Sequence, residues 1–436
     1  MHINYHSFTS TSRTKLKPDS ITGISIFDNG IPSEMDKSRC PKSTISTPTL
    51  ASTGLDLISD AQTFEEEQFD GFKKGLYYPV NIGDVFVSKY QVLGKLGYGV
   101  SSTVWLARDL QAHKHVTLKV YIRDGDPLEE FKIYQQLSKG NHSHPGYSHI
   151  RTALETFTIP RPGGDHTCLV QKPMWESFRD LRHRIPDGLF TEVLLKGALK
   201  QLFLALDYLH TECKLVHTDI KANNILSQIE DESILDAFTA AEMEHPSPRK
   251  FVNGVTIYAS RQLEVPKFFG DSVLSDFGSA VQGDLKRNHN AGPQIYRAPE
   301  VMVKAAWSYP VDIWNVGVMI WDLFEGKHMF HGNDPDGKGY STRAHLAEVI
   351  GMLGPPPLNL LEKGVRASEF FDKEGKWIAE VPIPQGTNLE NSEMRLEGKK
   401  KEVFLQMMRG MFQWRPEDRK TAKQMLEEPW INKMIE

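Results

Sequence analysis

The sequence predicts an α+β fold in two lobes, in which a small antiparallel β-rich lobe precedes a larger, mainly helical lobe. Three β-rich runs separated by glycine-rich or charged turns, at residues 90–96, 102–107 and 116–121, predict the sheet. Apolar residues between positions 195 and 209 then recur at helical spacing, and mostly helical sequence follows. Because two such lobes leave a junction where ligands commonly bind, we look for the functional residues there.

Length and composition are those of an ordinary globular protein. The chain has 436 residues, 39% hydrophobic and 25% charged, with a formal net charge of −5. This charge argues against direct nucleic-acid binding as the main activity. The three cysteines, Cys40, Cys168 and Cys213, are too few and too widely spaced to indicate a disulfide framework or a zinc site. No apolar run is long enough for a membrane span, so we expect a soluble intracellular protein.

The first 75 residues are rich in Ser, Thr, Pro and Lys and show no lasting helical or strand period. Such a segment cannot bury enough apolar surface to order itself, so we predict a disordered tail over residues 1–75. A few basic residues among its hydroxyl residues also occur in mitochondrial transit peptides, which is the alternative. The β-rich lobe is then expected at 76–174 and the helical lobe at 175–436, with an insert at about 228–270.

A glycine-containing stretch between the first two predicted strands is a candidate phosphate-binding loop. Gly97 and Gly99 have no Cβ and would let the backbone approach phosphates, while Val104 offers an apolar wall for a purine. The alternative is a simple hairpin turn, because Ser102 stands where a third glycine would complete the pattern. The residues assigned to this site are Leu96, Gly97, Tyr98, Gly99 and Val104.

A lysine in the third predicted strand is the next candidate. Lys119 lies in an otherwise apolar run, where leaving it buried without a partner would be costly. Glu130, on the helix predicted over residues 127–137, is the candidate partner. An ion pair between them would hold the ammonium group against the α- and β-phosphates of a nucleotide. The alternative is two unrelated surface charges.

The most specific segment is His-Thr-Asp-Ile-Lys-Ala-Asn-Asn at residues 217–224, directly after the predicted amphipathic helix. Asp219 can accept the proton of a substrate hydroxyl, Lys221 can neutralise a transferring phosphoryl group, and Asn224 can ligate magnesium. Asp276, in Asp-Phe-Gly, is a candidate second magnesium ligand. Asp-x-Lys-x-x-Asn also occurs by chance in surface loops, but less often between apolar strands after a long helix.

Three charged residues further along the chain have predicted structural roles. Glu300, in Ala-Pro-Glu, should pair with Arg419. Asp312, which begins an apolar helix, should bind backbone amides of the loop at 217–219. These residues are expected to hold the site rather than perform chemistry.

The order of these motifs resembles the protein-kinase superfamily over residues 78–435. The resemblance implies the bilobal protein-kinase fold and the transfer of the γ-phosphoryl group of ATP, with Mg²⁺, to protein substrates. Lys221 then favours serine or threonine over tyrosine as the acceptor. The resemblance also places Gln171 at the gatekeeper position, and Lys172 and Met174 where hinge backbone groups would bind adenine.

Within the superfamily the chain resembles the SR-protein kinases of the CMGC group, which phosphorylate arginine/serine-rich splicing factors. The segments that resemble this family are residues 78–84, 101–106 and 217–219 and the insert at 228–270. The resemblance implies arginine/serine-rich proteins as substrates, and we expect a monomer in the cytoplasm, the nucleus or both. The acidic residues that help this family to dock arginine-rich segments are replaced by Ala344 and Gly351.

Two hypotheses remain for the activity. The first is an active serine/threonine kinase, because every group that phosphoryl transfer requires is present. The second is a pseudokinase, in which the same fold serves as a binding module. Ser102, Gln171 and Pro293, which replaces the usual threonine before Ala-Pro-Glu, are the only support for the second hypothesis.

Activation-loop phosphorylation is not expected to be required. The arginine that often precedes the catalytic aspartate, and that grips a loop phosphate, is replaced by Thr218. Between Asp276 and Glu300 the hydroxyl residues are Ser279 and Tyr296, and both are expected to be structural. The alternative is a phosphorylation site elsewhere, in the tail or the insert.

Overall fold

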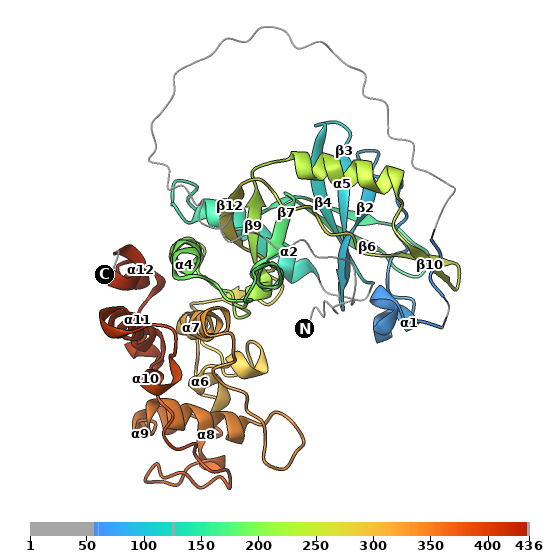
Figure 1. Ribbon diagram of the computed structural model, residues 1–436. Coiled ribbons are helices and arrows are strands. Elements are labelled where there is room, and N and C mark those ends of the chain that lie inside the picture. Colours follow the sequence, from blue (N-terminus) through green and yellow to red (C-terminus); the bar gives the residue numbers. More distant parts are fainter. Residues whose placement is uncertain (1–55, 60, 124–126, 434–436) are drawn as a thin grey trace.

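The computed structural model describes residues 56–59, 61–123 and 127–433, and it has the two lobes that the sequence predicts (Figure 1). In this part of the chain the main sheet is antiparallel, with the strand order β1-β2-β3-β4-β6-β5. Its strands are β1 (Val85–Phe86), β2 (Tyr90–Gly99), β3 (Ser102–Asp109), β4 (Lys114–Tyr121), β5 (Ala153–Ile159) and β6 (His166–Gln171). The three predicted strands are confirmed as β2, β3 and β4.

Both faces of the main sheet are covered, which explains why its strands read as continuous apolar runs. Neighbouring residues of β2 enter different cores: Leu93 belongs to the large cluster that also contains residues of α2 (Pro127–Lys139), while Val92 packs with Trp105 on the opposite face. The predicted helix over residues 127–137 is therefore confirmed as α2, two residues longer than expected.

The second lobe is mainly helical. Its central helix, α7, is buried along almost its whole length, as expected of a helix that is apolar on all sides. Among the described residues no helix combines the length and hydropathy needed to cross a bilayer. The helices are α3 (Phe178–Arg184), α4 (Glu192–Asp207), α6 (Pro299–Met302), α7 (Pro310–Phe324), α8 (Thr342–Leu353), α9 (Leu358–Leu361), α10 (Leu389–Ser392), α11 (Gly398–Met411), α12 (Ala422–Leu426) and α13 (Pro429–Asn432).

Short strands lie near the junction of the two lobes, and their pairing fixes the ends of the loops that carry the candidate catalytic residues. β9 is the central strand of a three-stranded sheet and pairs with both β7 and β12, while β8 pairs with β13. The bounds are β7 (Met174–Ser177), β8 (Leu215–Val216), β9 (Ile225–Ile229), β12 (Phe269–Leu274) and β13 (Val281–Gln282).

The insert lies on the small lobe, although the sequence assigned it to residues 175–436. It forms α5 (Ser233–Glu244) and the hairpin of β10 (Arg249–Val252) and β11 (Val255–Tyr258). In Figure 1, α5 lies across the strands of the main sheet. The Phe238 ring of α5 packs so closely on β2 that a Cβ added to Gly94 would lie only 2.7 Å from it. The Tyr258 ring of β11 packs edge to face against Trp105. Burial of these apolar side chains on the sheet explains why the insert packs on the small lobe rather than on the large one.

The end of the predicted tail is also folded. Residues 61–75 contain η2 (Glu65–Gln68) and α1 (Asp70–Lys73). Lys95 of β2 is fully buried, pairs with Glu66 and Glu65, and donates to the Tyr258 carbonyl oxygen at 3.0 Å. Leu57 also forms a β-bridge with Arg249 of the insert. The prediction of a disordered tail over 1–75 is therefore wrong for residues 56–59 and 61–75, because it rested on apolar surface and did not consider pairing of the glutamates with buried lysines. Residues 1–55 of that tail lie outside the described residues.

The insert provides a second anchor for this segment. Lys250 of β10 is buried and its ammonium group lies 2.8 Å from a carboxylate oxygen of Glu67. Ser260, just after β11, donates its backbone N–H (3.0 Å) and its hydroxyl (2.8 Å) to Glu65. Three successive glutamates thus connect the N-terminal segment to the insert and to β2.

Removing this segment should destabilise the protein. In a chain that begins at Gly71, the buried Lys95 loses both carboxylates, and breaking a buried pair costs about 3–5 kcal/mol. We expect the free energy of unfolding in urea to fall by about that amount. A chain that begins at Asp56 keeps these contacts and serves as the control. Equal stability of the two chains would contradict this account.

Candidate active site

Two loops with candidate catalytic residues are held side by side by strand pairing. Residues 217–224 connect β8 to β9, and residues 275–280 connect β12 to β13. Because β9 pairs with β12 and β8 pairs with β13, both ends of one loop are fixed to both ends of the other. The fold thereby brings Asp219 and Asp276 to the same region, although 56 residues separate them in the chain.

The buried carboxylate of Asp312 fixes the backbone of the first loop. Its two oxygens accept the backbone N–H groups of His217 and Thr218, each at 2.8 Å, and His210 Nε2 lies 2.9 Å from Oδ2. The predicted role of Asp312 is confirmed. Thr218 has a φ of +69°, a conformation that costs a β-branched residue about 1–3 kcal/mol. The hydrogen bonds from Asp312 hold this strained conformation in place.

Two other candidate side chains, those of Lys221 and Asn224, meet at the carboxylate of Asp219. Lys221 Nζ lies 2.7 Å from Asp219 Oδ2, and Asn224 Nδ2 donates to the same oxygen at 3.0 Å and to the Asp219 carbonyl oxygen at 2.8 Å. Hydrogen bonds to an ionised acceptor are strong, so this carboxylate has a fixed orientation. Oδ1 makes none of these contacts and is the oxygen that a substrate hydroxyl could approach.

Lys119 joins the small lobe to the second loop. Its ammonium nitrogen lies 3.3 Å from Glu130 Oε1 and 3.2 Å from Asp276 Oδ1. Glu130 comes from α2, Lys119 from β4 and Asp276 from the loop after β12, so three separate parts of the fold meet in one ion cluster. The ion pair between Lys119 and Glu130 that the sequence predicts is present.

The charges of this cluster support one another. Burial alone would lower the pKa of Lys119, but the neighbouring Asp276, Tyr121 and Glu130 raise it well above its ordinary value. The Lys119 ammonium group in turn holds the pKa of Asp276 below its ordinary value, against the opposing effect of burial. Both groups are therefore charged at neutral pH. The ammonium group can bind a phosphate, and the carboxylate can bind a cation.

The glycine loop forms the turn between β2 and β3. Gly97 pairs with Val104 across the hairpin, as the sequence places them. The Tyr98 side chain is buried against residues outside the loop: its ring lies 6.1 Å from that of Phe69, and its hydroxyl accepts from Gln68 at 3.1 Å. Of the residues assigned to phosphate binding, Tyr98 can therefore contribute its backbone rather than its ring.

The predicted adenine-binding residues lie between β6 and β7. The amide of the buried Gln171 donates to the Tyr134 hydroxyl at 3.3 Å. The Lys172 carbonyl oxygen accepts from Arg151 at 3.1 Å. A carbonyl oxygen has two lone pairs, so it can also accept a hydrogen bond from adenine. Met174 begins β7 and is partly exposed.

The donor set fits a magnesium ion that is shared with a nucleotide. In the described part of the chain no three His, Cys, Asp or Glu side chains form a metal cluster. Asp276 and Asn224 instead offer one carboxylate and one amide oxygen. Mg²⁺ in nucleotide sites is commonly bound by one or two such groups together with phosphate oxygens. When bound, the ion would neutralise charge on the phosphates.

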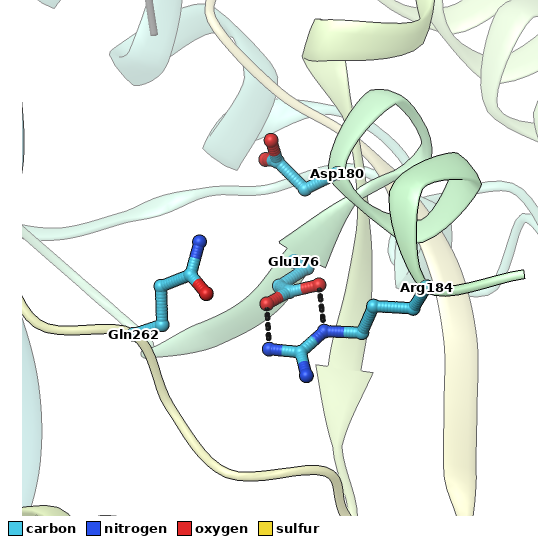
Figure 2. A pocket seen from close by; sticks show the side chains of 4 residues that line it. All are labelled: Glu176, Asp180, Arg184 and Gln262. Atoms are coloured by element: carbon cyan, nitrogen blue, oxygen red, sulfur yellow. Dashed lines mark hydrogen bonds and ion pairs between the residues drawn. The ribbon is translucent and has the colours of Figure 1, made fainter. Parts of the chain in front are cut away.

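A small pocket next to the hinge was not foreseen from the sequence. Figure 2 shows the Arg184 guanidinium group facing the Glu176 carboxylate, with Nε 2.6 Å from Oε2. Gln262 of the insert lines the same pocket, and the Trp175 indole N–H donates to the Glu264 carbonyl oxygen at 3.0 Å. The insert thus reaches the hinge. No local sequence signal reveals this, because the partners are nearly 90 residues apart.

Comparison with known proteins shows which sequences this chain resembles. The model of the protein kinase domain matches residues 90–263 and 269–431. A serine/threonine protein kinase of Aspergillus fumigatus is 43% identical over 386 residues, which is 88% of this chain and 94% of the relative. A serine/threonine-protein kinase SRPK of Physarum polycephalum is 28% identical (84% and 91% covered), and an SRSF protein kinase 3 of Sus scrofa is 23% identical (89% and 94% covered).

Proposed function

The chain belongs to the protein kinase family, and we propose from this premise that it transfers the γ-phosphoryl group of Mg²⁺-bound ATP to serine hydroxyls in arginine-containing protein segments. It is a serine/threonine protein kinase related to the SR-protein kinases, and its substrates are proteins. The observation that supports its chemistry best is the meeting of Lys119, Glu130 and Asp276 within 3.3 Å.

Each side chain of the site has a role that its contacts support. Asp219 orients the substrate hydroxyl and accepts its proton, and Lys221 is placed to neutralise the transferring group. Lys119 would bind the α- and β-phosphates, while Asn224 and Asp276 would hold Mg²⁺, whose charge stabilises the transferring phosphoryl group.

A role as a binding module alone has no support in the site. Ser102 is buried and pairs with Gly99 in the hairpin, and the amide of Gln171 is bonded to Tyr134. Both residues therefore have structural roles that do not conflict with catalysis. Pro293, which precedes the short helical turn η6 (Gln294–Tyr296), has no hydroxyl to donate to the catalytic loop, but Asp312 already holds that loop by accepting the backbone N–H groups of His217 and Thr218.

Substitution of the two central charges tests the proposed chemistry. Asp219→Asn removes the proton acceptor and Lys119→Met removes the phosphate-binding ammonium group, so we expect kcat/KM to fall at least about a hundredfold in each variant. Lys114→Met, at the exposed start of the same strand as Lys119, is the matched control and should keep full activity. Steady-state assays with circular dichroism check activity and fold. Wild-type turnover by folded Asp219→Asn would refute the assignment.

The activation loop, residues 276–300, which we call the activation segment, is held by contacts that need no phosphate. The Thr218 hydroxyl donates to the Ser279 carbonyl oxygen at 2.8 Å. The Tyr296 hydroxyl donates to Asp322 at 2.6 Å, inside the protein. At the end of the segment Arg419 grips the buried Glu300 with two contacts of 2.6 Å, which confirms the predicted pair. Further support comes from Asn315, whose amide donates to the Tyr296 carbonyl oxygen at 2.6 Å.

Activity should therefore be independent of phosphorylation in this segment. We expect bacterially expressed protein treated with phosphatase to phosphorylate substrate within about twofold of the untreated rate, because the segment is already ordered. Mass spectrometry establishes the phosphate content of both samples. A large loss of activity that is restored by rephosphorylation within residues 276–300 would contradict this expectation.

The helix that docks arginine-rich segments in the resembled family corresponds to α8. The two positions of α8 that lack the acidic residues, 344 and 351, have no room for larger side chains. Ala344 is buried and packs with Val381. At Gly351 a Cβ would lie 2.6 Å from Thr387 Oγ1 and 2.9 Å from the Pro384 carbonyl oxygen. An acidic side chain at position 351 would therefore force the neighbouring residues to move.

An open groove of about 500 Å³ lies beside α8, and its arginines are already paired. Arg366 contacts Glu369 at 2.6 and 2.9 Å. Arg343, also in the groove, contacts Asp334 at 2.7 and 2.9 Å. A surface with balanced charges has little attraction for a long run of arginines. We infer that substrate arginines are recognised close to the acceptor serine rather than in this groove.

Peptide substrates test this inference. We expect serine with arginine on both sides to be phosphorylated faster than serine before proline or in an acidic context. Adding further arginine/serine repeats should change KM by no more than about twofold, because the groove offers no excess negative charge. The assay is a peptide array followed by steady-state kinetics. Equal turnover of the serine-proline peptide, or a tenfold fall in KM with added repeats, would contradict the proposal.

A further inference from the structure

Tyr77, which lies just after the N-terminal segment of residues 61–75, contacts the backbone of the glycine loop. The Tyr77 hydroxyl lies 2.6 Å from the Gly99 carbonyl oxygen and 2.9 Å from that of Val100. A phenol has one proton to donate, so the two carbonyls share it. Burial, helped by the nearby Glu66 carboxylate, raises the pKa of Tyr77, which keeps the hydroxyl protonated. Tyr77 is therefore a permanent donor to the turn of the loop.

Tyr77 is itself held in place. The carbonyl oxygen of Leu76 accepts from the Arg123 backbone N–H at 2.8 Å, and that of Tyr77 accepts from Arg161 at 3.1 Å. The buried Tyr77 ring lies 6.0 Å from the ring of Phe72, which belongs to α1. These contacts come from the end of β4, from the turn between β5 and β6, and from α1. The hydroxyl that meets the loop thus has a fixed position.

The N-terminal segment of residues 61–75 holds the loop at a second point. Gln68 donates to the Tyr98 hydroxyl at 3.1 Å, and the Phe69 ring lies 6.1 Å from that of Tyr98. Gln68 also donates to the Glu65 carbonyl oxygen at 2.8 Å, and Glu65 contacts the buried Lys95 of β2. The loop is therefore connected to the anchored part of the N-terminal segment through both its side chain and its backbone.

Peptide geometry gives these contacts a consequence for ligand binding. In a trans peptide bond the carbonyl oxygen and the N–H of the next residue point in opposite directions. When Tyr77 holds the carbonyl oxygens of Gly99 and Val100, the N–H groups of Val100 and Ser101 are directed away from Tyr77. Backbone N–H groups of a glycine loop are the groups that bind nucleotide phosphates.

We propose that Tyr77 is a positioning residue of the nucleotide site, which orients the glycine loop for the phosphates of ATP. It acts through the loop backbone, and it touches no reacting atom. The proposal rests on the kinase function given above. Its main tests measure nucleotide affinity and hydrogen exchange of the loop, and neither depends on phosphoryl transfer. A failure of this proposal can therefore be told apart from a failure of the catalytic assignment.

Tyr77→Phe keeps the ring and removes the hydroxyl that meets the loop. Tyr78→Phe is the matched control, because the Tyr78 ring packs edge-on against Phe86 and His166 instead. Three properties are measured for each variant and the wild type. They are hydrogen–deuterium exchange of residues 97–102 without ligand, affinity for the non-hydrolysable analogue AMP-PNP with Mg²⁺ by calorimetry, and KM and kcat for ATP.

For Tyr77→Phe we expect exchange in residues 97–102 to become at least about threefold faster, since the local hydrogen bonds are weakened. Affinity for AMP-PNP should fall about fivefold and KM for ATP should rise equally, while kcat at saturating ATP stays within about twofold. Tyr78→Phe should match the wild type in all three. Unchanged exchange or unchanged affinity in Tyr77→Phe, or the same changes in Tyr78→Phe, would overturn the proposal.

Discussion

The carboxylate of Asp312 is the contact on which the catalytic geometry depends. It holds the backbone at His217 and Thr218, and thus sets the direction in which the next residue, the catalytic aspartate, leaves the strand. The His217 ring packs against Phe277 of the neighbouring loop, and Phe277 packs against Tyr134 of α2. Because α2 also carries the glutamate that pairs with the strand lysine, one buried charge in the large lobe is linked by packed rings to the phosphate-binding lysine of the small lobe.

The small lobe has a second source of order, which lies outside the catalytic motifs. The insert covers the sheet with α5, and the N-terminal segment lies against both the insert and β2. Lys95, fully buried among Glu65, Glu66 and the Tyr258 carbonyl oxygen, is the point where all three meet. Removing both glutamates would leave the Lys95 charge buried and uncompensated, so the three parts are expected to fold as a unit.

Much of this arrangement could be predicted from the sequence, and the limit is set by distance along the chain. Strands and helices follow local periodicity, and the residues of the catalytic loop lie within a few positions of one another, so their roles could be assigned from spacing alone. The partners of Lys95 lie 29 and 163 residues away, and no periodic pattern relates them. The sequence of a charged segment such as 61–75 predicts a disordered, solvent-exposed chain, because it does not reveal the buried residues with which the charges pair.

The central claim is that this kinase has its catalytic groups assembled without any phosphate on the activation segment. A crystal structure of the phosphate-free protein with AMP-PNP and Mg²⁺ tests it most directly. The account predicts that Lys119 and Glu130 remain paired at about the present 3.3 Å and that Asn224 and Asp276 both bind the metal. A structure in which α2 has moved so that Glu130 no longer reaches Lys119, or in which neither residue binds the metal, would contradict it.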